Sequence, residues 1–368
     1  MTAQPSTIYD VARVAGVSIA SVSRVLNGQG NPRADTRQRV LQAVEELGFV
    51  PDGAARALSA RLKEVVGVVI RRPRWHGANM FADEDDNLQF PDMINRGMRI
   101  VAQRHGFDLL IRSVDLDEPD ADRHVFALAR KSDGLILHDR VLSPEELDTL
   151  SRQVPVVTLA GVPTQTTANV HGDNEEGMRA LARHLIDDHG YRTIAYLAGH
   201  EGSPDSITRG QALADAVAAA GATLFTGEEW RGGYQAAAGA RAIERLIAAG
   251  TDLPRAIVCA NDQSAIGVLH ALAQHGIAVP GEVAVTGFDD MPLARHLRPQ
   301  LTTVRQSIQD LGATAFETVY AMIGREPRAA DSPRGRDIVL PTTLICRESC
   351  GCEPHSLSPT PRAQEAAG

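Results

Sequence analysis

Hydrophobic positions recur at helical spacing in three short runs within the first fifty residues. The first run has apolar residues at positions 8, 11, 12 and 15, which share one face of a helix. Thr7 caps this run, and Gly16 and Ser18 separate it from the second. The apolar stripes expected in the second and third runs are Val22, Val25, Leu26, Val40, Leu41, Val44 and Leu47. The pattern predicts three helices, of which the first two cross closely as in a helix-turn-helix.

The face left exposed on the second predicted helix suits DNA. It carries Ile19, Ala20, Ser21, Ser23 and Arg24. Short hydroxyls and one arginine favour phosphate contacts, whereas Ile19 and Ala20 are small and apolar enough to meet thymine methyl groups in a major groove. A helical hairpin that merely packs on something else is the alternative. Three helices in under fifty residues with a hydroxyl-rich face favour DNA.

From residue 65 the hydrophobic pattern changes to short apolar runs that alternate with helix-length polar stretches. The runs are 65–70, 108–111, 134–138, 154–159, 193–197, 256–260 and 282–287. Continuous apolar strands between helices predict parallel sheets that are covered on both faces. Seven or more such strands over about 280 residues predict two α/β lobes.

Polar side chains come after several predicted strands, and two of them, Asn261 and Asp289, follow directly. The full set is Asp173, Arg209, Asn261 and Asp289. Because ligands of open parallel sheets bind off the carboxyl ends of the strands, these groups are expected to hydrogen-bond a polyhydroxylated ligand. Trp230 is the expected aromatic for stacking on a ring face. Each polar residue alone is more typical of a helix cap, and their convergence on one edge is what favours a binding site.

Residues 7–27 closely resemble the helix-turn-helix of the lactose-repressor/galactose-repressor (LacI–GalR) family. The matching stretches are DVA, AGVS, SVSRVLN, TR and LGFVP. The resemblance implies that Ile19 and Ala20 choose bases, that the nearby serines hold the DNA backbone and that Arg24 reaches the DNA. The full set of DNA contacts predicted in this segment is Thr7, Ser18, Ile19, Ala20, Ser21, Ser23, Arg24 and Asn27.

Residues 51–64, PDGAARALSARLKE, are too short and too poor in large apolar groups to fold alone. The resemblance implies a hinge helix that pairs with that of a second subunit over the minor groove. Leu58 would wedge into the central base step, with Ala55 one turn earlier. A plain interdomain linker is the alternative.

The resemblance extends from residue 7 to about 350. It is strongest at 260–272 and 283–306, and it implies a periplasmic-binding-protein-like body. The effector contacts that it implies are Arg209, Asn261, Asp289, the aromatic Trp230 and, as a weaker transfer, Asp173. The chain between Trp230 and Gly233 is shorter than is usual in the family.

Charge and composition add to this picture. The net charge is −9, but residues 1–64 hold eight basic and six acidic side chains, which indicates a polyanion partner for the head only. Four cysteines fit a reducing compartment, and free thiols are favoured over a metal site because no matching Cys/His pair lies nearby in the sequence. His184 and His189 lie on one predicted helix without a third ligand, and exposed polar positions are expected for both.

The sequence therefore predicts an N-terminal all-α helix-turn-helix domain (1–50), a hinge (51–64), a two-lobed α/β effector and dimerisation domain (65–350) and a disordered tail (351–368). Neither an enzyme motif, a cofactor nor a metal site is expected. The predicted function is a homodimeric, sugar-responsive repressor that binds a near-palindromic operator in the bacterial cytoplasm, associated with the nucleoid when bound to DNA and independent of membranes. A sugar-binding protein without a regulatory role and a regulator with a nucleobase-type corepressor are the alternatives.

Overall fold

The computed structural model describes residues 6–26, 31–49, 62–72, 89–115, 120–138, 141–323 and 333–353. The predicted DNA contacts Asn27, Ala55 and Leu58 lie outside these residues, as do most of the hinge segment and residues 354–368 of the predicted tail. Among the described helices, none has both the length and the apolar character that crossing a bilayer requires.

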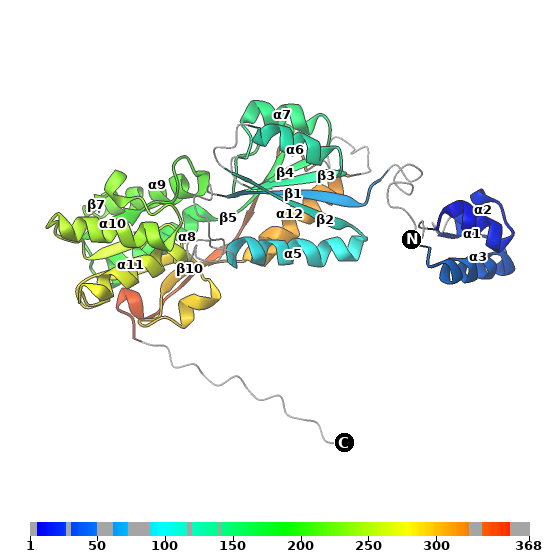
Figure 1. The fold of residues 1–368 in the computed structure, drawn as a ribbon. Coiled ribbons are helices and arrows are strands. Elements are labelled where there is room, and N and C mark those ends of the chain that lie inside the picture. Colours follow the sequence, from blue (N-terminus) through cyan, green and yellow to red (C-terminus); the bar gives the residue numbers. More distant parts are fainter. Residues whose placement is uncertain are drawn as a thin grey trace, which may run out of the picture.

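Three short helices form the N-terminal part, drawn in blue in Figure 1: α1 (Ile8–Ala15), α2 (Ile19–Leu26) and α3 (Ala34–Leu47). Thr7 begins α1 with a capping box, in which its hydroxyl accepts from the Asp10 amide and the Asp10 carboxylate accepts from the Thr7 amide. Gly16 ends α1 with φ 63°, a left-handed conformation that favours glycine. The Ser18 hydroxyl then accepts from the Ser21 amide at 3.2 Å. The predicted boundaries of the first helix and the predicted start of the second are confirmed.

These helices share a small core of their own. It consists of Val11, Ala12, Ala15, Val22, Val25, Val40 and Ala43. The prediction that Leu41 belongs to it is wrong, because that side chain is 49% exposed. Leu41 lies about 100° around the helix from Val40, whereas Ala43 is one turn away and faces the core.

The rest of the described chain forms two α/β lobes, each built on a six-stranded sheet. The first sheet holds β1 (Val65–Arg72), β2 (Asp108–Asp115), β3 (Gly134–His138), β4 (Val156–Leu159), β5 (Ala168–Gly172) and β11 (Asp337–Leu340). The second holds β6 (Thr193–Leu197), β7 (Thr223–Phe225), β8 (Ala256–Cys259), β9 (Ala284–Asp289), β10 (Thr302–Gln306) and β12 (Thr342–Ile345).

The strand orders are β11-β5-β4-β3-β1-β2 and β12-β10-β9-β8-β6-β7. Each strand pairs in parallel with its neighbours, except that β12 runs antiparallel to β10. The predicted fold class, a helix-turn-helix followed by two parallel α/β lobes, is confirmed.

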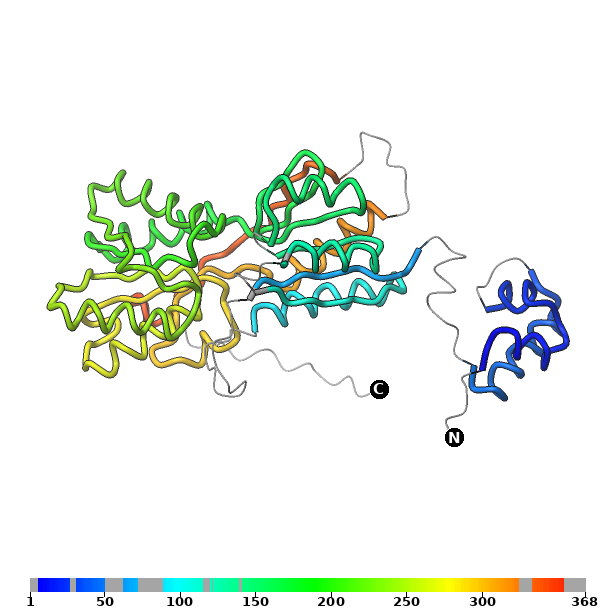
Figure 2. The backbone as a smooth tube through the Cα atoms, turned by 45° about the horizontal axis from the view of Figure 1, so that its top comes forward, coloured from blue at the N-terminus to red at the C-terminus, as the bar shows by residue number. Residues whose placement is uncertain are grey.

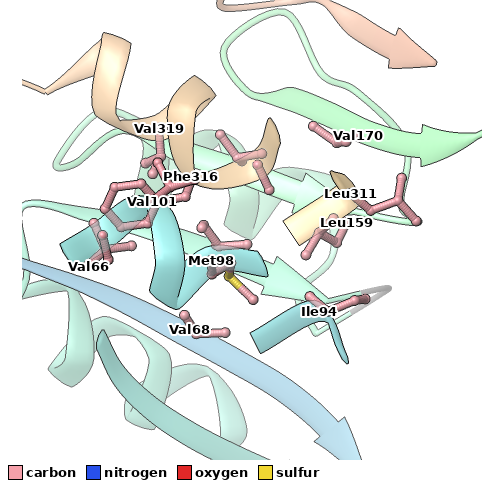
Figure 3. Packing of buried hydrophobic residues seen from close by; sticks show 14 of the residues in the cluster. Val66, Val68, Ile94, Met98, Val101, Leu159, Val170, Leu311, Phe316 and Val319 are labelled. Carbon is pink, nitrogen blue, oxygen red and sulfur yellow. The ribbon is translucent and has the colours of Figure 1, made fainter. Parts of the chain in front are cut away.

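Helices cover both faces of each sheet. On the first sheet, α5 (Gln89–His105) and α12 (Ile308–Met322) share one core, and α6 (Ala121–Ala129) and α7 (Pro144–Ser151) share the other. Figure 3 shows the α5–α12 side, where Met98 and Phe316 pack over β1. On the second sheet, α8 (Asn174–Arg183) and α9 (Pro204–Ala219) face α10 (Ala236–Ala248) and α11 (Asp262–Gln274) across the strands.

The chain crosses between the lobes three times (Figure 2): from β5 to α8, from β10 to α12 and from β11 to β12. Each crossing follows the carboxyl end of a parallel strand. The crossings therefore bring these ends of the two sheets together, and Gly172 at the end of β5 touches Gln306 at the end of β10. A Cβ atom on Gly172 would lie 2.7 Å from the Gln306 side-chain oxygen.

Two glycines let α5 and α12 cross with their backbones in contact. A Cβ atom on Gly97 would collide with the main-chain carbonyl of Gln309, and one on Gly312 would collide with that of Ile94. Backbone atoms cannot rotate away as a side chain can, so any larger residue must push the helices apart.

We expect Gly97→Ala to lower the free energy of unfolding by about 1–3 kcal/mol through overpacking at this crossing. Urea denaturation of the full chain measures the change. Gln103→Ala, at an exposed position of the same helix, is the control and should leave stability near that of the parent. Equal stability of the two variants would contradict the close crossing.

Candidate functional site

The exposed face of α2 carries the residues that were predicted to contact DNA. Ser18, Ile19, Ala20 and Arg24 are exposed, Ile19 to 41%, while Ser21 and Ser23 are half-buried. Val22 and Val25 anchor the opposite face of this helix in the core. Thr7 is exposed at the start of α1. The helix therefore presents two apolar residues in its first turn, flanked by hydroxyls and a cation.

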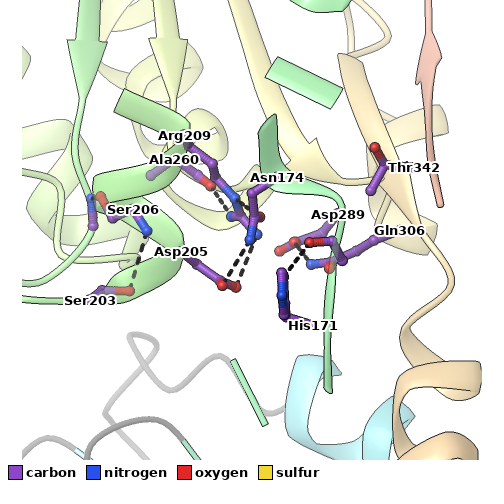
Figure 4. Close-up of polar contacts among 12 residues, drawn as sticks. His171, Asn174, Ser203, Asp205, Ser206, Arg209, Ala260, Asp289, Gln306 and Thr342 are labelled. Carbon is purple, nitrogen blue, oxygen red and sulfur yellow. Dashed lines mark hydrogen bonds and ion pairs between the residues drawn. The ribbon is translucent and has the colours of Figure 1, made fainter. Parts of the chain in front are cut away.

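A second group of polar side chains meets at the junction of the two lobes (Figure 4). Its centre is Arg209 in α9, whose side chain is almost fully buried. Its Nε atom donates to Asn174 Oδ1 and its Nη1 atom to the Ala260 carbonyl, both at 2.7 Å, and Nη2 lies 3.4 Å from an Asp205 carboxylate oxygen. One guanidinium thus joins the start of α8, α9 and the end of β8.

The Arg209 guanidinium also stacks on an aromatic ring. Its Cζ atom lies 3.6 Å from the centre of the Phe288 ring, a cation–π contact that compensates for burial of the charge. A guanidinium has five N–H groups, and the three polar contacts described above use three of them. The other two N–H groups take part in none of these three contacts.

Asp289 ends β9 beside this arginine and is also buried. Its Oδ1 atom accepts from Gln306 Nε2 at 2.6 Å. Burial raises the pKa of Asp289 to about 7, against the opposing effects of the Arg209 charge and the Gln306 hydrogen bond. Beneath it, the Asp262 carboxylate accepts from the Met291 amide and the Thr303 hydroxyl, and its pKa is raised first by burial and then by the charge of Asp289.

The structure therefore brings Arg209 and Asp289 together, as their places after predicted strands suggested. Asn261 lies nearby, but its Oδ1 atom caps α11 by accepting from the Ser264 amide, and its Nδ2 atom donates to the Tyr234 carbonyl. Asp173 caps α8 by accepting from the Glu176 amide. Both residues therefore act as helix caps, the alternative to ligand binding that the sequence offers for each of them.

The expectation that Trp230 stacks on a ligand needs correction. Its side chain is 2% exposed and packs in the core between the second sheet and α10 and α11. Besides Phe288, the aromatic Tyr234 lies at the polar group: its hydroxyl shares a 2.9 Å hydrogen bond with Ser203, and its main-chain carbonyl accepts from Asn261. Hydrophobic periodicity cannot tell which of Trp230 and Tyr234 is buried. A single aromatic residue in a short loop belongs to no repeating pattern that would assign it to the core or to the surface.

Sequence reasoning also missed Asn174, Asp205 and Gln306. Gln306 is the last residue of β10, and Asn174 follows β5 by two positions. Both could have been found in the sequence, because ligands of open parallel sheets bind at the carboxyl ends of the strands. Asp205 lies one helical turn before Arg209, and this spacing is the signal of a pair on one helix face.

The interpretation of His184 and His189 is wrong in two respects. His184 is buried, with 9% of its surface exposed. Two further candidate ligands, Cys350 and Cys352, lie beside the pair, although the predicted tail begins at residue 351. Both cysteines come from the segment that follows β12, which the sheet brings back to the end of α8.

Comparison with known proteins gives two family matches. Residues 7–52 match the model of bacterial regulatory proteins of the lacI family, and residues 182–350 match a periplasmic binding protein-like domain. The HTH-type transcriptional regulator GalS of Salmonella typhimurium strain LT2 is 34% identical over 84% of this chain and 88% of its own length.

Two solved structures resemble the whole fold. The lac repressor dimer bound to operator and the anti-inducer ONPF has 25% sequence identity and a TM-score of 0.78, over 94% of this chain and 99% of that one. The complex of the transcriptional regulator CelR with cellobiose has 29% identity and a TM-score of 0.65, over 94% of this chain and 99% of that one.

The raised pKa of Asp289 makes stability depend on pH. The folded chain holds this proton up to about pH 7 whereas the unfolded chain releases it near pH 4, so the contribution of Asp289 to stability falls as pH rises between these values. We expect Asp289→Asn, which keeps an acceptor for Gln306, to gain about 2 kcal/mol relative to the parent chain between pH 5 and pH 8. Urea unfolding at both pH values measures the difference, and parallel pH profiles would contradict the assignment.

Proposed function

Because this chain belongs to the LacI family of bacterial regulatory proteins, we propose that it is a repressor of sugar-metabolism genes whose effector is a sugar. The chain is a DNA-binding transcriptional regulator rather than an enzyme, and its partners are operator DNA and a small effector. The observation that carries the sugar proposal is the buried meeting of Arg209 and Asp289 at the lobe junction.

A sugar fits the hydrogen-bonding capacity of this junction. Each sugar hydroxyl both donates and accepts, so neighbouring hydroxyls need acceptors and donors side by side. Asp289 offers its second carboxylate oxygen as an acceptor, and Arg209 offers two N–H groups as donors. Charged hydrogen bonds of this kind are strong and directional, which makes them selective for the orientation of hydroxyls.

Two further observations favour a sugar over a flat nucleobase. Among the described aromatic side chains at the junction, Phe288 is covered by the Arg209 guanidinium, and Trp230 is packed in the core. Phe288 and Trp230 therefore offer no free ring face to a base, and Tyr234 is left as a single ring rather than a pair that could enclose one. The likeness to the CelR–cellobiose complex supports the same ligand class.

The proposed effector contacts are Arg209 and Asp289, with Asn174, Asp205 and Gln306 holding them in place. In this proposal, Asn261 and Asp173 act mainly as caps that fix where α11 and α8 begin. Trp230 supports the site from the core.

For DNA, we propose that Ile19 and Ala20 read bases while Ser18, Ser21, Ser23, Arg24 and Thr7 hold phosphates. The exposure of the first turn of α2 supports this division. A homodimer on a near-palindromic operator follows from two-fold symmetry, and the likeness to a lac repressor dimer on its operator supports it.

The three crossings offer a route from the effector to the DNA-binding helices. The chain enters the first lobe at Lys63, whose amide donates to the Asp133 carboxylate and whose Nζ atom donates to the Ser132 carbonyl. A movement of this lobe therefore carries residue 63 with it. An effector that binds one arrangement of the lobes better than the other would shift operator affinity, typically by about 1–3 kcal/mol.

Arg24→Ala should weaken operator binding about equally for all DNA sequences and reduce the dependence of log affinity on log salt by about 0.9, the value for one lost phosphate contact. Fluorescence anisotropy over a salt series, on an operator selected from random duplexes with the parent protein, makes the measurement. Arg104→Ala removes the same charge from an exposed position of α5 and is the matched control. If the parent selects no preferred sequence, sequence-specific regulation is refuted.

The effector proposal predicts that a monosaccharide or disaccharide raises Tm in a panel of sugars and nucleobases and then releases the operator. At pH 8, where Asp289 is ionised, Asp289→Asn should lose at least about tenfold in affinity for that sugar, because a charged acceptor becomes neutral, while operator affinity in the absence of sugar is retained. Asp215→Asn, at an exposed position of α9, should bind normally. Stabilisation by nucleobases alone, or tighter operator binding with the sugar, would overturn this proposal.

A further inference from the structure

A cluster of four metal-binding side chains lies at the opposite end of α8 from Asn174. It consists of His184, His189, Cys350 and Cys352, each of which offers one ligand atom, and the four atoms lie within 4.8 Å of one another. None of these residues belongs to the effector or DNA contacts described above. Two imidazoles and two thiols around one point have no evident purpose in the regulator mechanism.

Four of the six distances between the ligand atoms are close to those of a tetrahedral metal site. The two Nε2 atoms lie 3.2 Å apart, Nε2 of His184 lies 3.4 Å from each sulfur, and Nε2 of His189 lies 3.5 Å from Cys352 Sγ. Tetrahedral zinc with ordinary bond lengths places two nitrogens about 3.3 Å apart and a nitrogen and a sulfur about 3.6 Å apart. Ordinary packing does not require this convergence.

The backbone is shaped to bring the two histidines together. Residues five positions apart on an α-helix point about 140° away from each other. Here the helix continues as a π-helical turn, His184–Asp188, and the His189 amide donates to the His184 carbonyl. This wider turn places both Nε2 atoms on one side, and such turns are found often at functional sites.

Gly351, between the two cysteines, lets the C-terminal segment turn so that both sulfurs approach the histidines. Gly351 has φ 104°, and a Cβ atom there would lie 3.0 Å from the Tyr191 hydroxyl and 3.4 Å from the His189 ring. The Tyr191 hydroxyl donates to the Cys350 carbonyl at 2.8 Å, and the Thr302 hydroxyl donates to Cys350 Sγ at 3.0 Å. The turn is thereby fixed with both sulfurs toward the histidines.

A carboxylate orients one of the imidazoles. Nδ1 of His184 lies 2.8 Å from Asp188 Oδ2, which favours the proton on Nδ1 and leaves Nε2 as the ligand atom. Histidines that bind metals usually have such a partner on the other nitrogen. Free thiols, which the sequence favoured over a metal site, would not require the histidines and cysteines to converge in this way.

We propose that His184, His189, Cys350 and Cys352 bind one zinc ion that ties the C-terminal segment to the end of α8. Two nitrogens and two thiolates in tetrahedral geometry select zinc among common metals, and four protein ligands leave no position for a substrate. Binding converts two thiols to thiolates and releases two protons to solvent. The site is structural, since the ion links residues 184 and 350 and so closes a loop that contains most of the second lobe.

The test uses the full chain purified without a polyhistidine tag. Elemental analysis by mass spectrometry should find about one zinc per chain, and cobalt substitution should give the intense visible bands of a tetrahedral site with thiolate charge transfer. A strong chelator should lower Tm by several degrees in a manner that zinc reverses, because the ion binds only the folded chain.

Variants identify the ligands. Cys352→Ser and His189→Ala, neither of them fully buried, should lose most of the zinc and the effect of the chelator on Tm. Cys346→Ser is the matched control, because that thiol contacts Cys352 without belonging to the four, and it should keep both. The cobalt spectrum of the parent chain tests the site independently of how the variants fold.

Three results would overturn the proposal. The first is a parent chain that takes up neither zinc nor cobalt after reduction. The second is a disulfide between two of these cysteines, found by mass spectrometry of the protein purified under reducing conditions. The third is equal loss of zinc in Cys346→Ser and Cys352→Ser, which would show a different ligand set.

Discussion

The arrangement of the body depends on keeping the charge of Arg209 satisfied inside the protein. A buried guanidinium without partners would cost several kcal/mol, so the surrounding elements must supply acceptors at fixed places. They come from three separate parts of the chain: Asn174 at the start of α8, Asp205 in α9 and the Ala260 carbonyl after β8. Phe288 covers the face of the guanidinium. The same contacts that satisfy the charge hold the guanidinium in one position.

This requirement places the proposed effector site next to the crossings between the lobes. Asn174 begins α8 directly after the crossing from β5, and Gln306 ends β10 directly before the crossing to α12. A ligand that engages Arg209 and Asp289 therefore acts on residues next to two of the three crossings. By contrast, the core of the N-terminal helices consists of a few small apolar side chains, and it shares none of its residues with the cores of the lobes. The described DNA-binding helices therefore depend on their own packing.

Helix α8 has a different task at each end. Its start provides Asn174 to the proposed effector site, and the π turn at its end provides His184 to the histidine–cysteine cluster. A metal at that end would fix the helix against β12 and the segment that follows it. The effector site would then have one rigid side in the second lobe, and rearrangement would be concentrated at the crossings.

The sequence by itself determined the features that arise from neighbours along the chain. The capping box of Thr7, the left-handed Gly16, the alternation of strands and helices, and the polar residues after strand ends all depend on contacts a few positions apart. Only the tertiary structure decided which side chains meet across long separations. It buried Trp230, paired Asp289 with Gln306 and brought Cys350 to His184 across 166 positions. The physical reason is that strand order and lobe crossings, which local periodicity does not encode, set these distances.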